Sequence, residues 1–373
     1  LFRSILNTVD TLREQGMLDT LRLLHYHQGS QVPDIKSIRE AATEAARIYT
    51  DLINEGATMG LLDIGGGLGI DYDGSRSESH SSRNYGIQEY AADIVDVVKT
   101  VCDEGKFHHP TIISESGRAV AAYYSVLIFN ILDVNSPSAD SIPQSVPENP
   151  HPHLIKLSEV ESYLEEANLQ ECYNDALYYR EEILSLFRHG NVSLRERAYC
   201  NSLLTRIMTR IHEIADTMEQ PPEALAEGNP FRDVYYGNFS LFQSLPDSWA
   251  IDQLFPVMPI HRLDEEPSAR ATLADITCDC DGRIDKFIIN GEHQDHLPLH
   301  QLKDNEDYLL GVFLVGAYQE TLGDLHNLLG DTNVVSIGIK NGNIQYLREL
   351  AGDTISDVLS YVEYDTKNLI ERF

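Results

Sequence analysis

Three consecutive glycines, Gly65, Gly66 and Gly67, follow an apolar run in the segment LLDIGGGLGID, residues 61–71. Backbone N–H groups in a glycine turn after a parallel strand can close on a phosphate. The dinucleotide fingerprint would need a glycine where this sequence has Ile70, and the lysine of a Walker A loop is absent. The glycines therefore indicate either a phosphate site of another class or a tight turn that needs positive φ.

Two histidines stand two positions apart in LLHYHQGSQ, residues 23–31. Strand alternation predicts that His25 and His27 point to the same side, and the Gly29–Ser30 turn ends the strand. Such a pair at the mouth of a barrel could bind a metal, stack on a ring or fill space. The spacing favours a functional role without choosing among these.

An acid and a cation lie three positions apart in ISESGRAV, residues 113–120. A surface salt bridge between Glu115 and Arg118 would be common and weak. Both are nevertheless expected on the face that carries the glycine turn, where an arginine can bind phosphate in a bidentate manner. Tyr318, in GVFLVGAYQE at 311–320, follows another predicted buried strand.

Two cysteines occur in DITCDCDGRID, residues 275–285. Cys278 and Cys280 lack the second ligand pair of a structural zinc site. Asp279 and its neighbours either form a hairpin turn or make an acidic loop for recognition and proton transfer.

The first 134 residues alternate between strand and helix patterns, which is typical of a parallel sheet or a (β/α) barrel. In such a barrel the carboxyl ends of the strands form the catalytic face. The expected strands are 21–26, 60–64, 110–114 and 119–132, and the expected helices are 4–16, 34–55 and 86–103.

Two further regions follow a Pro/Ser-rich stretch at 133–153, which reads as a linker or surface loop. Residues 154–226 are predicted to form a helical region, because long apolar stripes at helical spacing dominate it. Residues 227–373 carry short Val, Ile and Phe runs between turn residues, which predicts a β-barrel or sandwich.

Composition excludes some functions. A net charge of −31 and a pI near 4.6 argue against nucleic-acid binding. No apolar run approaches the roughly 20 residues of a membrane span. Five scattered cysteines favour a reducing compartment, so we expect a cytoplasmic protein. Because the chain begins at Leu1 without Met, we also expect a fragment of a longer protein.

The order and the amino-acid sequences of these segments resemble those of the fold-type III, alanine racemase-like pyridoxal-phosphate decarboxylases, and within them the biosynthetic arginine decarboxylases. The motifs that carry the resemblance are LLHYHQGSQ, LLDIGGGLGIDYDG, NYGIQEYA, ISESGRAV, YGNFSLFQSLPDSWAIDQLFPV, DITCDCDG and VGAYQETLGDLHNLLGD. The resemblance implies the C-terminal part of a (β/α)8 barrel, a helical-bundle insertion and a C-terminal β-rich domain. It also implies decarboxylation of L-arginine to agmatine, the first step of a route to putrescine and spermidine.

The resemblance assigns the cofactor, pyridoxal 5′-phosphate, to matching positions. His27 would stack on the ring, and Glu115 would hold the pyridinium nitrogen. A carboxylate keeps that nitrogen protonated because an opposite charge favours the charged form, and the protonated ring can delocalise a carbanion. The remaining positions would surround the phosphate: Ser30, Gly65, Gly66, Gly67, Arg118 and Tyr318.

The substrate positions follow in the same way. Cys278 would return a proton to the substrate carbon and Asp279 would face the far end of the substrate, both in the site of a partner subunit of a homo-oligomer. The resemblance also implies Asp252 as a second acid for the guanidinium. Members of the family are described as using Mg²⁺, for which the sequence indicates no ligands.

Three alternatives stay open. The chain could belong to a decarboxylase of ornithine, lysine or diaminopimelate. A metal-dependent hydrolase could use His25 and His27, with further ligands at later strand ends. A decayed, non-enzymatic decarboxylase-like regulator would have no need to keep Glu115, Arg118 and Cys278, and this sequence has all three.

The family's Schiff-base lysine lies on an early barrel strand, and none of the lysines here stands in a matching motif. We expect that lysine, and the family's extreme C-terminal segment, to lie outside this chain. The isolated chain mixed with pyridoxal 5′-phosphate should therefore show no borohydride-sensitive Schiff-base absorption. The appearance of such a band would contradict this expectation.

Overall fold

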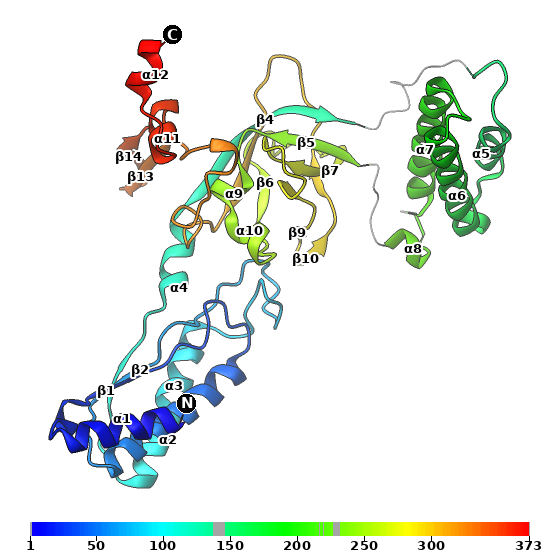
Figure 1. The fold of residues 1–373 in the computed structure, drawn as a ribbon. Helices are drawn as coiled ribbons and strands as arrows, with labels where there is room; N and C mark the ends of the chain where they lie inside the picture. The colour runs from blue at the N-terminus through cyan, green and yellow to red at the C-terminus, as the bar shows by residue number, and fades with distance from the viewer. Residues whose placement is uncertain (1, 137–145, 216, 219, 227–231, 373) are drawn as a thin grey trace.

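Three parts of the chain are distinct in the computed structural model, which describes residues 2–136, 146–215, 217–218, 220–226 and 232–372. A parallel α/β part carries the N-terminus, a β-rich part follows it in the middle of the molecule, and a helical bundle stands to one side (Figure 1). This arrangement of a partial barrel, a bundle and a sheet-rich region confirms the predicted fold class.

The N-terminal part contains a three-stranded parallel sheet in the order β1-β2-β3. Helix crossovers join its strands, as parallel pairing requires. Apolar residues at helical spacing along α2, Ile38, Ala42 and Tyr49 among them, pack into one core with Leu62 of β2. The elements are α1 (Phe2–Glu14), β1 (Leu23–His25), α2 (Ile35–Asn54), β2 (Leu61–Asp63), α3 (Ile87–Gly105) and β3 (Thr111–Ile113).

The prediction of one strand over 119–132 is wrong in its first half. Residues Gly117–Ala121 form helix α4, Ala122–Tyr124 form the 3-10 turn η2, and strand β4 covers Val126–Asn135. A short apolar run fits helix and strand equally well, so periodicity could not separate them. Strand β4 pairs with β5 and β12 in the sheet of the β-rich part, and it does not extend the parallel sheet of β1, β2 and β3.

The β-rich part is built on a seven-stranded sheet in the order β11-β7-β5-β4-β12-β6, with β8 paired to β7. Strands β5 and β7 are parallel and the other pairs antiparallel. The strands are β5 (Asp233–Gly237), β6 (Val257–Pro259), β7 (Ala269–Ala274), β8 (Arg283–Ile284), β11 (Leu297–Leu299) and β12 (Leu309–Phe313). Short helices α9 (Leu241–Ser244) and α10 (Pro246–Ala250) follow β5, and β9 (Phe287–Ile289) pairs with β10 (Glu292–Gln294).

The helical region has its own core. Its helices are α5 (Pro152–Tyr163), α6 (Leu169–Arg188), α7 (Leu194–Ala215) and the short α8 (Glu223–Ala226). Of the predicted linker, residues 137–145 lie outside the described residues. No helix of the described chain is long and apolar enough to cross a membrane.

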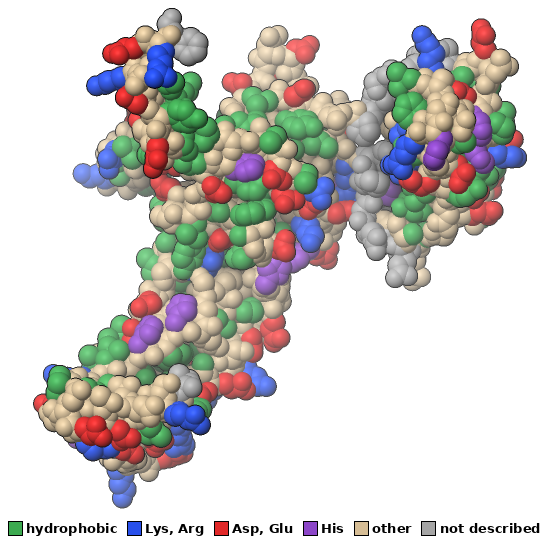
Figure 2. Space-filling model, in the orientation of Figure 1, with side chains coloured by type: hydrophobic (Ala, Val, Ile, Leu, Met, Phe, Trp, Pro, Cys, Tyr) green, Lys and Arg blue, Asp and Glu red, His purple; other side chains and the backbone are tan. Residues whose placement is uncertain are grey.

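The C-terminal segment is a hairpin followed by two short helices. Strands β13 (Val334–Lys340) and β14 (Asn343–Leu350) pair antiparallel, and α11 (Ile355–Tyr361) and α12 (Thr366–Arg372) follow. Ile339 and Tyr346 of the hairpin are strongly exposed. Figure 2 shows hydrophobic side chains gathered along one side of this segment, whereas acidic and basic side chains are interspersed elsewhere on the visible face.

The bundle core generates a stability prediction. Ile207 of α7 is fully buried, so Ile207→Ala should lower the free energy of unfolding of the bundle by about 2–5 kcal/mol. Urea denaturation followed by circular dichroism measures this change. Leu194→Ala, at a position that is 73% exposed on the same helix, is the matched control and should change stability little. Equal losses for the two variants would contradict the assigned core.

Candidate active site at the ends of the parallel strands

The glycine turn begins directly after β2 and lies against its neighbours in the parallel sheet. Gly65 and Gly67 have φ of 61° and 123°, in the region that favours glycine. Asp63 Oδ1 accepts a hydrogen bond from the Gly65 N–H at 2.9 Å, and the Glu115 N–H donates to the Gly65 carbonyl at 3.0 Å. A Cβ on Gly65 would collide with the carbonyl oxygen of Tyr26. Close packing and positive φ therefore both require glycine here.

The two histidines contact different groups. His27 Nδ1 accepts a hydrogen bond from the Gly66 N–H at 3.2 Å, and a Cβ on Gly66 would lie 2.9 Å from His27 Cε1. His25 Nδ1 instead lies 2.9 Å from Asp63 Oδ2. Strand β1 ends at His25, so strand alternation does not extend to His27. The structure thus places His27 against the glycine turn and His25 against the acid that supports this turn.

Arg118 connects the strand ends with the β-rich part. Its Nε donates to Ser30 Oγ at 3.0 Å and its Nη1 to the Tyr72 hydroxyl oxygen at 2.9 Å. Nη2 lies 3.6 Å from Asp247 Oδ2, and the guanidinium carbon stands 4.8 Å from the centroid of the Tyr318 ring. The Ser30 hydroxyl also donates to the Tyr318 hydroxyl at 3.1 Å. Ser30, Arg118 and Tyr318 are therefore brought together in one network.

The structure surrounds Arg118 with partners from the protein itself. Only 5% of this residue is exposed, and each of its three guanidinium nitrogens has a partner within the protein. A guanidinium carries five N–H groups, so these contacts use only part of its donor capacity. Arg118 thus contacts both Ser30 and Tyr318, and its role as a bidentate phosphate ligand stays a prediction.

Sequence reasoning missed two residues of this network, Tyr72 and Asp247. Burial raises the pKa of the Tyr72 phenol, and the neighbouring Arg118 opposes that shift. Asp247 is 7% exposed and lies on α10, inside a motif that supported the family resemblance. No local pattern marks either residue, because their partner Arg118 is far away in the chain.

Glu115 lies at the end of β3, beside His25 and Asp63. The ligand atoms of these three side chains lie within 4.8 Å of one another, close enough to hold a metal ion together. This set differs from the His25–His27 pair on which the hydrolase alternative was based. The same Glu115 carboxylate is the one expected at a pyridinium nitrogen. Metal binding and binding of the cofactor ring would therefore use the same carboxylate.

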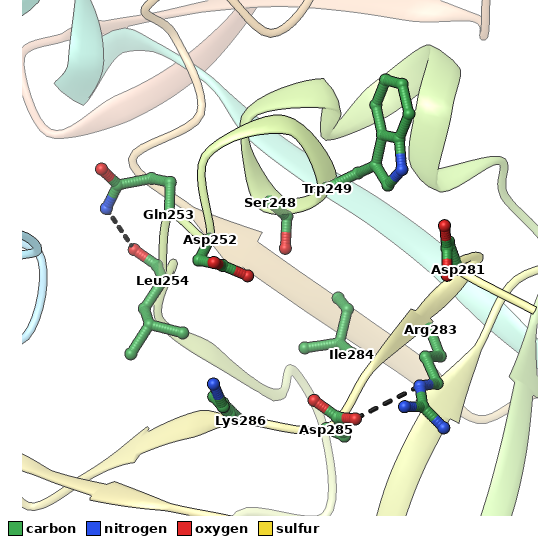
Figure 3. A pocket seen from close by; sticks show the side chains of 10 residues that line it. All are labelled: Ser248, Trp249, Asp252, Gln253, Leu254, Asp281, Arg283, Ile284, Asp285 and Lys286. Atoms are coloured by element: carbon green, nitrogen blue, oxygen red, sulfur yellow. Dashed lines mark hydrogen bonds and ion pairs between the residues drawn. The ribbon is translucent and has the colours of Figure 1, made fainter.

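Asp252 lines a separate cavity of about 300 Å³ near α10 and β8. Its backbone has φ of 54°, and its carbonyl accepts a hydrogen bond from His80 Nε2 at 3.0 Å. Asp285 also borders the cavity and lies 3.2 Å from Arg283 Nε (Figure 3). The lining residues are Ser248, Trp249, Asp252, Gln253, Leu254, Asp281, Arg283, Ile284, Asp285 and Lys286.

Cys278 and Asp279 belong to an exposed loop between β7 and β8. The Cys278 N–H donates to Asn327 Oδ1 at 3.0 Å, and Asn327 Nδ2 donates to Cys278 Sγ at 3.4 Å. Asp279 lies 3.9 Å from His326 Nε2. These contacts hold the loop against the turn at 326–328 and not against the glycine turn. A role for both residues in a partner subunit stays a prediction.

Two family profiles match parts of this chain. The family profile "Pyridoxal-dependent decarboxylase, pyridoxal binding domain" matches residues 3–122, and "Arginine decarboxylase helical bundle domain" matches residues 147–228. The chain is 46% identical to a biosynthetic arginine decarboxylase of Rhodopirellula baltica, over 98% of this chain and 60% of the relative. It is 48% identical to that of Thermosynechococcus vestitus, over 99% of this chain and 58% of the relative.

Solved structures agree with the sequence comparisons. The crystal structure of the biosynthetic arginine decarboxylase SpeA from Campylobacter jejuni matches with a TM-score of 0.82 at 33% identity, over 99% of this chain and 60% of that one. Diaminopimelate decarboxylase from M. jannaschi shares the fold alone, with a TM-score of 0.52 at 14% identity, over 92% of this chain and 52% of that one. The chain spans about 60% of the length of the curated relatives it matches. Over that length, the chain carries the pyridoxal-binding domain and the helical bundle domain that these two profiles describe, and it is similar throughout to biosynthetic arginine decarboxylases.

Proposed function

We propose that this chain, together with the segments of its relatives that it does not span, decarboxylates L-arginine to agmatine and CO2 with pyridoxal 5′-phosphate. The observation that carries the proposal is the group formed by Ser30, Arg118 and Tyr318 beside the glycine turn. This group combines a buried cation and two hydroxyls within one network, and the glycine turn lies close by, near the carbonyl of Gly29. Such donors suit a phosphate monoester.

The residues fit both ends of the cofactor. At the phosphate end, Ser30 and Tyr318 are partly exposed while Arg118 is buried behind them, so the hydroxyls can meet a ligand that the cation supports electrostatically. At the ring end, His27 lies against Gly66, and Glu115 is exposed beside the same turn. When bound, the cofactor supplies a cationic ring that delocalises the carbanion left by loss of CO2. Glu115 would accept the hydrogen bond of the ring nitrogen and keep it protonated.

Carboxylates are the groups proposed to bind the guanidinium end of the substrate. A guanidinium group is bound best by carboxylates in a bidentate manner, and Asp252 and Asp279 both offer exposed ones. The exposed thiol of Cys278 would return the proton to the substrate carbon. Because Cys278 and Asp279 do not contact the glycine turn within this chain, we propose that they act in the site of a partner subunit.

Further details of the proposal come from the family alone. They are a requirement for Mg²⁺, a place at the head of an agmatine route to putrescine and spermidine, and a homo-oligomer with shared sites. A cytoplasmic location is supported by the five cysteines, all of which are free thiols.

Two alternatives lead to different experimental results. A decarboxylase of ornithine, lysine or diaminopimelate would share the fold and the cofactor. A metal-dependent hydrolase is favoured by one observation, the close set of His25, Asp63 and Glu115. Loss of activity on cofactor removal, and its return on addition of pyridoxal 5′-phosphate alone, would exclude the hydrolase.

A substrate assay tests the central proposal. The full-length protein, loaded with cofactor, should release CO2 from L-arginine faster than from ornithine, lysine or diaminopimelate. The readout is labelled CO2 from each carboxyl-labelled amino acid at equal concentration. Preference for ornithine would contradict the arginine assignment and leave the fold intact, whereas no release from any of them would contradict decarboxylation itself.

The role of Glu115 leads to a separate prediction. Glu115→Gln in the full-length enzyme should lower kcat by roughly ten- to a hundredfold with little change in KM, because one charge-assisted contact contributes about 1.5–3 kcal/mol. Steady-state kinetics with arginine measures both constants. Glu89→Gln, an exposed acid on α3, is the control and should behave as wild type. A rise in KM alone would place Glu115 at the substrate and not at the cofactor ring.

A further inference from the structure

Asp247 occupies an unusual place in the network around Arg118. It lies on α10 of the β-rich part, 129 residues downstream of the arginine, and its carboxylate is largely buried. Its Oδ2 stands 3.6 Å from Arg118 Nη2. A buried guanidinium needs a buried counter-charge, because removal of either charge from water is costly unless both are paired. Asp247 supplies that charge from a different part of the fold.

Gln319 ties the same carboxylate to Tyr318. The Asp247 N–H donates to Gln319 Oε1 at 3.1 Å, and Gln319 Nε2 donates back to Asp247 Oδ2 at 2.8 Å. Only 2% of Gln319 is exposed, and the neighbouring Tyr318 is held at φ of 70°. A left-handed conformation of a tyrosine persists only where the surrounding structure imposes it. The two hydrogen bonds between Asp247 and Gln319 provide such a restraint.

The contacts form a closed circuit. Asp247 holds Arg118 on one side and Gln319 on the other, Arg118 donates to Ser30, and Ser30 donates to the hydroxyl of Tyr318. With Nη2 directed to Asp247, the Nε of the arginine points toward Ser30, and the guanidinium lies over the Tyr318 ring. The orientation of both hydroxyls at the phosphate end thus depends on a carboxylate behind them.

We propose that Asp247, with Gln319, is a positioning residue that sets the phosphate affinity of the cofactor site from the β-rich part. The inference rests on the proposed function, because it assumes that Ser30, Arg118 and Tyr318 meet the cofactor phosphate. It adds a residue that does not itself touch the phosphate. Docking of α10 against the parallel part then becomes a condition for tight cofactor binding.

The experiment compares two ligands that share a ring and differ in the phosphate. Equilibrium dialysis of the full-length apoenzyme gives the affinities for pyridoxal 5′-phosphate and for pyridoxal. Asp247→Asn keeps the shape and an oxygen for Gln319 but removes the charge. We expect about tenfold weaker binding of pyridoxal 5′-phosphate and a change of less than about twofold for pyridoxal.

A second variant and a control complete the test. Gln319→Met removes both hydrogen bonds to Asp247 and should weaken the binding of pyridoxal 5′-phosphate, but not of pyridoxal, in the same way. Asp264 is an exposed acid of the β-rich part, and Asp264→Asn should change neither affinity. Equal losses for both ligands would mean a general structural role and would overturn the proposal. Unchanged or tighter binding of pyridoxal 5′-phosphate would overturn it as well. If the wild-type apoenzyme bound neither ligand, the proposed function itself would fail.

Discussion

The buried positive charge of Arg118 is the constraint on which the site depends. Arg118 is only 5% exposed, so its charge must be neutralised and hydrogen-bonded inside the protein, and its partners come from four separate segments of the chain. Two of these segments follow strands of the parallel sheet, and two belong to the β-rich part. The requirement to pair one charge therefore holds the two parts together at the place where the candidate ligands converge.

A second constraint comes from the parallel sheet. Because parallel strands end at the same edge, β1, β2 and β3 bring His25, Asp63 and Glu115 together although they are distant in sequence. Asp63 uses one carboxylate oxygen for the glycine turn and the other for His25. The turn is thus held from the sheet side, while Arg118 orders the hydroxyl groups of the network.

Local patterns were sufficient for much of the fold. The buried face of α2, the strands before the glycine turn and before Glu115, and the helices of the bundle follow from periodicity and turn residues. The strand expected over 119–132 failed because a short apolar run does not distinguish helix from strand. The pairing of β4 with β5 and β12 depends on partners that lie about 100 and 180 residues away, and such pairing leaves no local signal.

The sequence by itself determined the residue types that can meet a phosphate, the local turns that present them and the motifs that mark the family. Glycine at positive φ, a serine after a strand and an arginine after an acid are properties of short segments, so they are visible without a structure. Only the tertiary structure decided what each one contacts: Tyr72 and Asp247 as partners of Arg118, and Asp63 rather than His27 as the partner of His25. The physical reason is that a buried charge selects its partners by distance in space, and long-range packing alone determines that distance.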